Sequence, residues 1–313
     1  MHQLTPGGGA AAASLAGATA SGLRYARPAP GIAAFVSGYQ IFDGRDAGEL
    51  PQVHHLLPGT ANVRVSIGAG PVEVAIGRRR FAPLPAVALT GPTSHAPRAT
   101  TRGGVLVAFG VTPLGWGRLF RRSAAELCDR IVPLGDVVGP ALPRALLDEL
   151  AASAEGDEVL AAGVLDRLLA PLLAEPGPDE AAIRALAAAL EDAGLTTVAD
   201  AVAHTGLPAA AIRRAAIRHF GMPTKLLLRR ARFLRAFLRF FRAGGELGYP
   251  GIEEHYHDVP HFLRDAHRFL GMTPRRFAAL STALLDESLR ARAAALGGST
   301  CVLHPGGTAA ADG

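Results

Sequence analysis

The sequence predicts an α+β fold of more than one domain, with a β-rich N-terminal half and an all-α C-terminal half. Three observations carry this prediction. At 313 residues the chain is long enough for two domains of ordinary size. Apolar residues recur with period two from about Ile32 to Val111, which indicates strands. After Trp116 the period becomes that of helices, and from Thr196 to about Leu296 it is helical throughout.

The strand pattern is clearest at residues 62–76. Val63 and Val65 alternate with Asn62, Arg64 and Ser66. The Gly- and Pro-containing segment 68–71 then turns the chain into a second alternating run at 72–76, and together the two runs predict a β-hairpin. Further apolar runs at 86–89 and 105–111 lie between Pro and Gly residues, so we expect an antiparallel sandwich or a small barrel.

Helical patterns follow near 141–153, 157–174 and 179–193, after a capping box formed by Ser123 and Glu126. This stretch is the predicted connector between the two halves. The predicted domain boundaries are a disordered tail at 1–22, a β-rich domain with its helical connector at 23–175, an all-α domain at 178–290, and a second disordered tail at 297–313.

Positive charge is concentrated in one part of the chain. Residues 196–281 hold 14 Lys and Arg against 6 Asp and Glu, a net charge of +8, although the whole chain has only +5. This is the distribution expected for contact with a polyanion. Two cysteines are too few for a disulfide framework, and no apolar run is long enough to cross a bilayer. We therefore expect a cytoplasmic protein with no membrane partner.

The segment 197–221 has the pattern of a helix-turn-helix. Thr197 and Asp200 can cap a short helix that Gly206 ends, and Pro208 can start the next one. Ile212, Ala215, Ala216 and Phe220 give the second helix an apolar inner face. Its outer face carries the cationic side chains that could reach a major groove: Arg213, Arg214 and Arg218.

A long helical pattern at 223–243 combines apolar residues with a basic stripe, formed by Lys225, Arg229, Arg232, Arg235, Arg239 and Arg242. We expect the apolar side to pack against two small helical units and the basic side to face a phosphate backbone or water. A basic amphipathic helix also suits a membrane surface or a partner protein, and this alternative stays open.

A second helix-turn-helix pattern runs from Ile252 to Gly271. Asp258 and Pro260 can start its second helix, and Gly271 can end it before a turn and a last short helix at Phe277. Phe262, Ala266 and Phe269 form the predicted inner face of the second helix. The predicted outer face shows His261, Arg264, His267 and Arg268.

The run DVPHFLRDAHRFLGMTP, from Asp258 to Pro274, resembles the C-terminal signature of AraC/XylS-type transcription regulators. The segments 220–223 and 232–236 resemble the end of that family's first unit and its linker helix. The resemblance covers about a third of the chain. It implies two helix-turn-helix units joined by a long helix, which insert their second helices into successive major grooves. By position, it assigns base contacts to Ala210, Arg213, Arg214, Val259, Pro260, Leu263 and Arg264, and the outward faces add Arg218, His261 and Arg268.

The N-terminal half resembles, more weakly, the cupin-like sensor domains that precede such units. Residues 126–134, ELCDRIVPL, match an ending found in one subgroup. The resemblance implies an effector-binding domain, a homodimer, or both. The expected partners are therefore double-stranded DNA, a small-molecule effector, a second copy of the chain, and RNA polymerase if the protein is an activator.

The main alternative is a cupin-type enzyme with an accessory helical domain. It would need a metal ion or a catalytic cluster within residues 32–120. Histidines at 54, 55, 95, 255 and 257 lack the spacing of metal ligands, and no Ser-His-Asp or paired-carboxylate arrangement stands out. We therefore expect no cofactor, no metal and no enzymatic activity.

Overall fold

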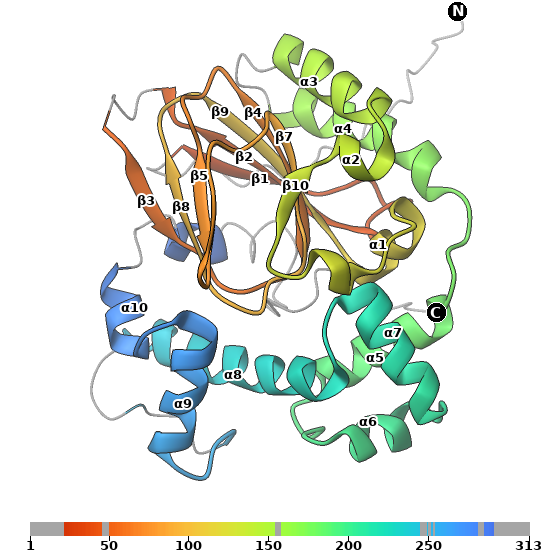
Figure 1. Cartoon of the computed structure of the whole chain (residues 1–313), viewed down its shortest axis with the longest axis vertical. Helices are drawn as coiled ribbons and strands as arrows, with labels where there is room; N and C mark the ends of the chain where they lie inside the picture. The colour runs from red at the N-terminus through yellow and green to blue at the C-terminus, as the bar shows by residue number, and fades with distance from the viewer. Residues whose placement is uncertain are drawn as a thin grey trace, which may run out of the picture.

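The computed structural model describes residues 22–45, 50–153, 158–244, 249, 252, 254–280 and 285–290. Strands form the N-terminal half and helices form the C-terminal half (Figure 1), so the predicted α+β class is confirmed. The two predicted tails lie outside the described residues, apart from Gly22.

The strands form two antiparallel sheets. The six-stranded sheet has the order β1-β2-β9-β4-β7-β10. Its strands are β1 (Leu23–Ala26), β2 (Val36–Asp43), β9 (Val105–Val111), β4 (Ala61–Ile67), β7 (Val87–Thr90) and β10 (Ile131–Pro133). The four-stranded sheet has the order β3-β8-β5-β6. Its strands are β3 (Gln52–His55), β8 (Pro97–Thr101), β5 (Glu73–Ile76) and β6 (Arg79–Phe81).

The predicted hairpin at 62–76 is wrong. β4 pairs with β7 and β9 in the six-stranded sheet, whereas β5 pairs with β6 and β8 in the other sheet. The Gly- and Pro-containing segment between them carries the chain from one sheet to the other. Both segments are strands, as their alternation predicts, but alternation gives no information on which strand is the partner.

Two apolar layers hold the N-terminal half together. One lies between the sheets, with Phe42 and Leu106 from the larger sheet against Val74 and Ala99 from the smaller one. The other lies between the larger sheet and helices, and Val63 and Leu89 are among its fully buried members. The helical elements of this half are α1 (Pro113–Leu119), the short 3-10 helix η2 (Ala124–Leu127), α2 (Gly135–Val138), α3 (Ala141–Ser153) and α4 (Glu158–Leu173).

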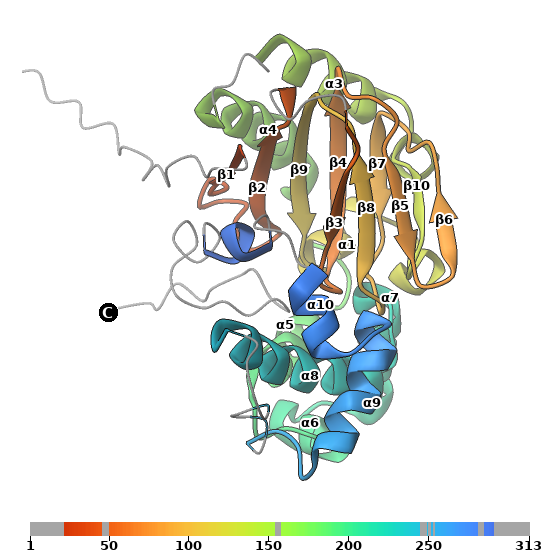
Figure 2. The same cartoon turned by 90° about the vertical axis from the view of Figure 1, so that its left-hand side faces the viewer.

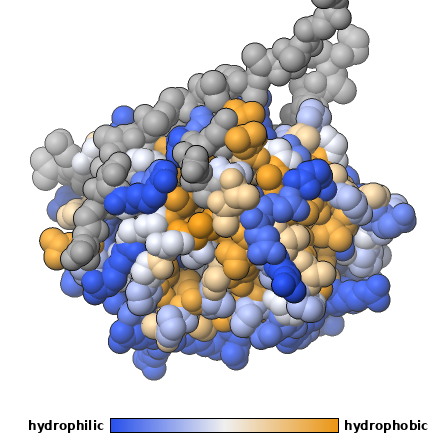
Figure 3. Space-filling view, turned by 90° about the horizontal axis from the view of Figure 1, so that it is seen from above, coloured by the Kyte–Doolittle hydropathy of each residue, from blue (hydrophilic) through white to orange (hydrophobic). Residues whose placement is uncertain are grey.

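In Figure 1 the smaller sheet lies on one side of the larger sheet, and α2, α3 and α4 lie on the other side. Seen from above, apolar side chains gather near the middle of this end of the molecule and hydrophilic ones surround them (Figure 3). The exposed apolar side chains of the described residues include Val159, Leu160 and Leu172, all on α4.

The C-terminal half is built around one long helix, α8. Its elements are α5 (Glu180–Glu191), α6 (Val198–Thr205), α7 (Ala209–Phe220), α8 (Thr224–Arg242), α9 (Val259–Leu270) and α10 (Pro274–Leu280), and residues 285–290 are also helical. Phe233 and Phe237 of α8 are fully buried. Phe233 stacks on Phe269 of α9 with ring centroids 5.2 Å apart, and Phe237 contacts Phe277 of α10 at 5.5 Å. These contacts place α9 and α10 on the same side of α8.

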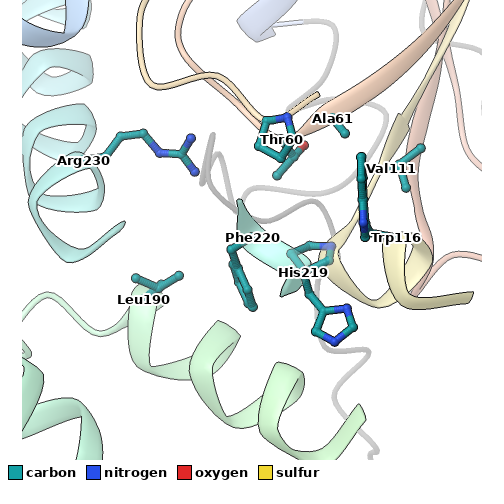
Figure 4. A pocket seen from close by; sticks show the side chains of 10 residues that line it. Thr60, Ala61, Val111, Trp116, Leu190, His219, Phe220 and Arg230 are labelled. Carbon is teal, nitrogen blue, oxygen red and sulfur yellow. The ribbon is translucent and has the colours of Figure 1, made fainter. Parts of the chain in front are cut away.

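The two halves are packed against each other. Arg230 of α8 is 3% exposed, and it donates hydrogen bonds to the carbonyl oxygens of Thr93 (2.7 Å) and Gly59 (3.2 Å). Figure 4 shows Arg230 reaching from its helix towards Thr60, while His219 and Phe220 lie below Trp116. Because the guanidinium binds main-chain oxygens of two loops of the sheet domain, it fixes α8 relative to the strands.

Candidate nucleic-acid interface

The first helix pair consists of α6 and α7. The Thr197 side chain accepts a hydrogen bond from Asp200 N at 3.1 Å, and Asp200 accepts one from Thr197 N at 2.8 Å, so the predicted capping box is confirmed. Gly206 ends α6 in the left-handed conformation with φ of 65°, as predicted. Pro208 then caps α7, and the turn between the helices is only three residues long (206–208).

The faces of α7 lie as its sequence pattern predicts. Ile212, Ala215, Ala216 and Phe220 are buried against the core of the C-terminal half or the adjoining sheet domain. The sequence-predicted contact residues on this helix, Ala210, Arg213, Arg214 and Arg218, are all exposed. The arginines line an open groove of about 630 Å³ beside α7, which also includes Ser123, Asp179 and Pro223.

The second unit is described from Asp258 onwards. Asp258 begins α9 by accepting a hydrogen bond from His261 N at 2.6 Å, and Gly271 ends it with φ of 74°. The predicted first helix of this unit, which would end near His255, falls largely on residues outside the described part of the chain. Where that segment is described, Tyr256 N donates to Ile252 O at 2.7 Å, which makes a turn before α9.

The sequence-predicted contact residues of α9 differ in exposure. Pro260, Arg264 and Arg268 are exposed, whereas Val259, His261 and Leu263 are half-buried. His261 is half-buried because its ring packs edge-on against Tyr256 with centroids 5.1 Å apart, and its Nε2 lies 3.4 Å from Arg232.

The predicted role of the basic stripe on α8 is wrong for three of its six members. Arg229 and Arg232 bind the carboxylate of Asp265 on α9, and Arg235 donates to Leu190 O at 2.9 Å. Because these three guanidinium groups have protein partners, they hold α8 to neighbouring segments. Lys225, Arg239 and Arg242 are exposed, and Arg239 also pairs with Glu254.

The packing of α8 argues against the alternative that this helix binds a membrane surface or a partner protein. The apolar side of α8, including Leu227, Phe233 and Phe237, lies in the core of the C-terminal half. The helix therefore has no apolar side to offer to a lipid surface or a partner groove. In addition, none of the described helices is both long and apolar enough to span a bilayer.

Asp265 is a buried acid that the sequence patterns did not single out. Its carboxylate is fully buried and accepts hydrogen bonds from Arg229 Nε at 2.6 Å and Tyr256 Oη at 2.7 Å. Burial raises the pKa of Tyr256, and the hydrogen bond to Asp265 raises it further, so the phenol stays protonated as a donor. A signal was present in the sequence, because Asp265 lies beside Ala266 on the inward side of an amphipathic helix.

α7 and α9 have the same orientation towards the sheets. At the C-terminal end of α7, Ser123 Oγ donates to Ile217 O, and a Cβ at Gly221 would lie 3.1 Å from Ala124 O. At the C-terminal end of α9, Ala96 N donates to Phe269 O at 2.7 Å. Both helices therefore meet the sheet domain with their last turns and direct their first turns away from it, as Figure 1 also shows. Ala210, Val259 and Pro260 lie in those first turns, and Arg213 lies at the start of the next turn of α7.

The spacing of the two helices is set by α8, which lies between them in Figure 1. With 19 residues α8 is about 28 Å long, since an α-helix rises about 1.5 Å per residue. This is comparable to one turn of B-DNA, roughly 34 Å. The arrangement can therefore present two exposed helix starts, with arginines beside them, to one side of a rod-shaped polyanion.

The described part of the chain contains no group of three His, Cys, Asp or Glu side chains placed to hold a metal ion. Cys128 is half-buried with a free thiol, and burial together with Asp129 raises its pKa to about 12. The thiol is therefore protonated and a poor nucleophile at neutral pH.

No family model matches this chain, and no curated protein matches it. Solved structures that are similar include ToxT from Vibrio cholerae O395 bound to (E)-4-(8-methylnaphthalen-1-yl)but-3-enoic acid, with 11% identity over 74% of this chain and 99% of that chain and a TM-score of 0.42. Wild-type ToxT from Vibrio cholerae strain SCE256 with a bound unsaturated fatty acid has 11% identity over 74% and 95% of the two chains, with a TM-score of 0.41. The AraC-like transcriptional activator CuxR has 13% identity over 75% and 82%, with a TM-score of 0.27.

Proposed function

We propose that this chain is a sequence-specific, DNA-binding transcription regulator of the AraC/XylS type, with a cupin-like effector domain before its DNA-binding domain. One observation carries the proposal. α7 and α9 both direct their first turns away from the sheet domain, at a separation that α8 sets, and both expose arginines. In this arrangement α7 and α9 are the second helices of two helix-turn-helix units.

The residues on the outer faces of α7 and α9 indicate which side chains would contact bases and which would contact phosphates. On α7, Arg213 and Arg214 have the length and donor geometry to reach guanine edges, while Ala210 allows close approach. On α9, Arg264 would contact bases, with Val259, Pro260 and Leu263 offering apolar contact to thymine methyl groups. Arg218, Arg268 and the half-buried His261 lie where they would contact phosphates and fix the register.

The target is expected to contain two short boxes about one helical turn apart, roughly 34 Å. Binding to phosphates predicts that affinity falls steeply as salt concentration rises. The sheet domain would bind a small-molecule effector, and the exposed apolar side chains of α4 favour a homodimer. Contact with RNA polymerase is expected if the protein activates transcription.

The test is selection of bound sequences from a random DNA pool, followed by titration of the selected site with variants. Arg214→Ala and Arg264→Ala should each weaken specific binding by about 1 to 3 kcal/mol. Arg144→Ala is the matched control, because Arg144 is an 85% exposed arginine on α3, in the other half of the molecule. If both helix variants bind the selected site as tightly as the control does, the assignment of α7 and α9 is wrong.

A further inference from the structure

A cavity of about 100 Å³ lies between the two sheets, away from the proposed DNA-binding helices. Leu23, Phe42 and Leu106 of the larger sheet form apolar walls, and Ala99 and His54 of the smaller sheet lie opposite. Few interiors of this kind contain a space larger than a water molecule. The cavity is therefore a feature of the packing that needs a physical reason.

The most unusual group in the cavity is Arg64 on β4. Its cross-strand neighbours on either side are small, Ala88 and Ala108, which leave room around it. The alternation of β4 predicts a polar face in water, but the smaller sheet covers this face, so Arg64 lines the cavity instead. Arg64 Nη1 is buried and has no hydrogen-bond partner among the described residues. Among the described residues, no acidic side chain lines the cavity either. A buried cation without a counter-ion is strongly destabilising.

His54 is the second donor. The residue is 7% exposed, its Nε2 lies 3.3 Å from Thr101 Oγ1, and its Nδ1 has no partner among the described residues. Burial, followed by the charge of Arg64, lowers the pKa of His54, so the ring is neutral. If the Thr101 hydroxyl donates to Nε2, the proton of the neutral ring is on Nδ1. This leaves an N–H donor available beside Arg64.

The outer wall of the cavity comes from the far end of the chain. Ser288, in the helix at residues 285–290, lines the cavity, and its Oγ lies 2.6 Å from Tyr25 Oη. Figure 2 shows this helix, in blue, near β1 and β2, the last two strands at one edge of the larger sheet. A molecule in the cavity would therefore lie against both the sheets and a segment that follows the second helical unit.

We propose that this cavity binds a small organic anion with an apolar body. The anionic group of this ligand, such as a carboxylate, would accept hydrogen bonds from Arg64 and His54. These bonds would satisfy both donors and neutralise the charge of Arg64. The apolar walls would enclose the apolar body of the ligand. A cavity of about 100 Å³ suits a body somewhat smaller than a benzene ring, since benzene fits a cavity of about 150 Å³. Such an anion would be the effector proposed above. Its binding does not depend on the proposed transcription function, but its role in regulation does.

The experiment is calorimetric titration of the full chain, without DNA, with three probes of similar shape: butanoate, butanamide and butylammonium. We expect butanoate to bind one site at least about tenfold more tightly than butanamide, and butylammonium not to bind. Because no DNA is present, the result is independent of the proposed transcription function.

Variants identify the site. Arg64→Gln should weaken butanoate binding at least about tenfold and leave butanamide binding unchanged. Arg98→Gln is the matched control, since Arg98 is an exposed arginine on β8 next to Ala99. Without probe, Arg64→Gln should not lower the melting temperature, because it removes an uncompensated buried charge. A purely structural role for Arg64 would instead lower it.

Three results would overturn the proposal: no binding of butanoate at millimolar concentration, equal affinity for butanoate and butanamide, or unchanged butanoate binding by Arg64→Gln. Ser288→Ala tests the outer wall separately. It should weaken butanoate binding by a few-fold without changing the preference for the anion over the amide. Unchanged binding by this variant would remove the C-terminal helix from the site.

Discussion

At the scale of single residues, Asp265 joins several segments of the second helical unit. It lies on α9, is fully buried, and binds Arg229 and Arg232 of α8 together with Tyr256 from the turn before α9. Three segments therefore meet at one carboxylate. Removal of this carboxylate would leave two arginines near the core without a counter-ion, which costs more than the loss of an exposed ion pair.

Asp265→Ala should lower the free energy of unfolding by about 3 to 5 kcal/mol, because it breaks a buried, hydrogen-bonded charge cluster. Urea denaturation followed by circular dichroism measures the change. Asp148→Ala is the control, since Asp148 is 69% exposed and pairs with Arg144 on α3. That variant should change stability by less than about 0.5 kcal/mol. Equal effects of the two substitutions would mean that Asp265 does not hold the unit together.

At the scale of elements, the ends of α7 and α9 are alike in conformation but differ in surroundings. Gly221 and Gly271 both follow their helices with positive φ, 78° and 74°. A Cβ at Gly271 would have no atom of the described residues within 4 Å, whereas a Cβ at Gly221 would lie 3.1 Å from both Ala124 O and Pro92 Cγ. Gly221 is therefore required both for the helix end and for the packing of α7 on the sheet domain.

A pair of substitutions separates these two roles. Gly271→Ala should cost about 1 to 2 kcal/mol, the usual penalty of a left-handed conformation for a residue with a Cβ. Gly221→Ala should cost more, because the tight contact with Ala124 and Pro92 is added to the same backbone penalty. Thermal unfolding of both variants measures the difference. If Gly221→Ala were no more destabilising than Gly271→Ala, α7 would not be packed on the sheet domain as described.

At the scale of the whole molecule, the contact between the halves decides where α7 and α8 lie. Arg230 binds carbonyl oxygens of the sheet domain, and Arg118 of α1 binds Glu180 of α5 at 2.7 Å. His219 of α7 is buried at the same contact, where its Nε2 lies 3.3 Å from Asp179 and its Nδ1 has no partner among the described residues. A ring this buried is costly to charge.

This histidine predicts a pH dependence of stability. Burial lowers the pKa of His219 in the folded protein, an effect that its contact with Asp179 opposes and the charge of Arg218 reinforces. In the unfolded chain its pKa is about 6.5. Below that pH the unfolded chain takes up a proton that the folded chain does not, so stability falls as the pH falls from 7.5 to 5.5.

Urea denaturation at pH 7.5 and 5.5 measures the loss of stability. His54, His55 and His255 also have lowered pKa values because of burial, so they add to the loss in the native chain. His219→Gln should make the loss smaller by at most about 1.4 kcal/mol per pH unit, and should not abolish it. The same loss in the variant and in the native chain would show that His219 is not buried at this contact.

The sequence by itself determined the ends of the helices α6 and α9, which belong to the C-terminal half. Thr197 with Asp200, Gly206, Asp258 and Gly271 lie at the predicted helix ends, because capping groups and glycines act within a few residues of where they stand. The inner and outer faces of α7 were predicted for the same reason, since helical periodicity is a local property.

Only the tertiary structure decided which distant groups meet. β4 pairs with β7 and β9 and not with β5, although the alternation of each strand was plain from the sequence. Arg64 faces a second sheet and not water, and Arg229 turns to Asp265 and not to solvent. Periodicity tells which side of an element a residue occupies. What covers that side depends on contacts between residues far apart in the chain, which no local pattern encodes.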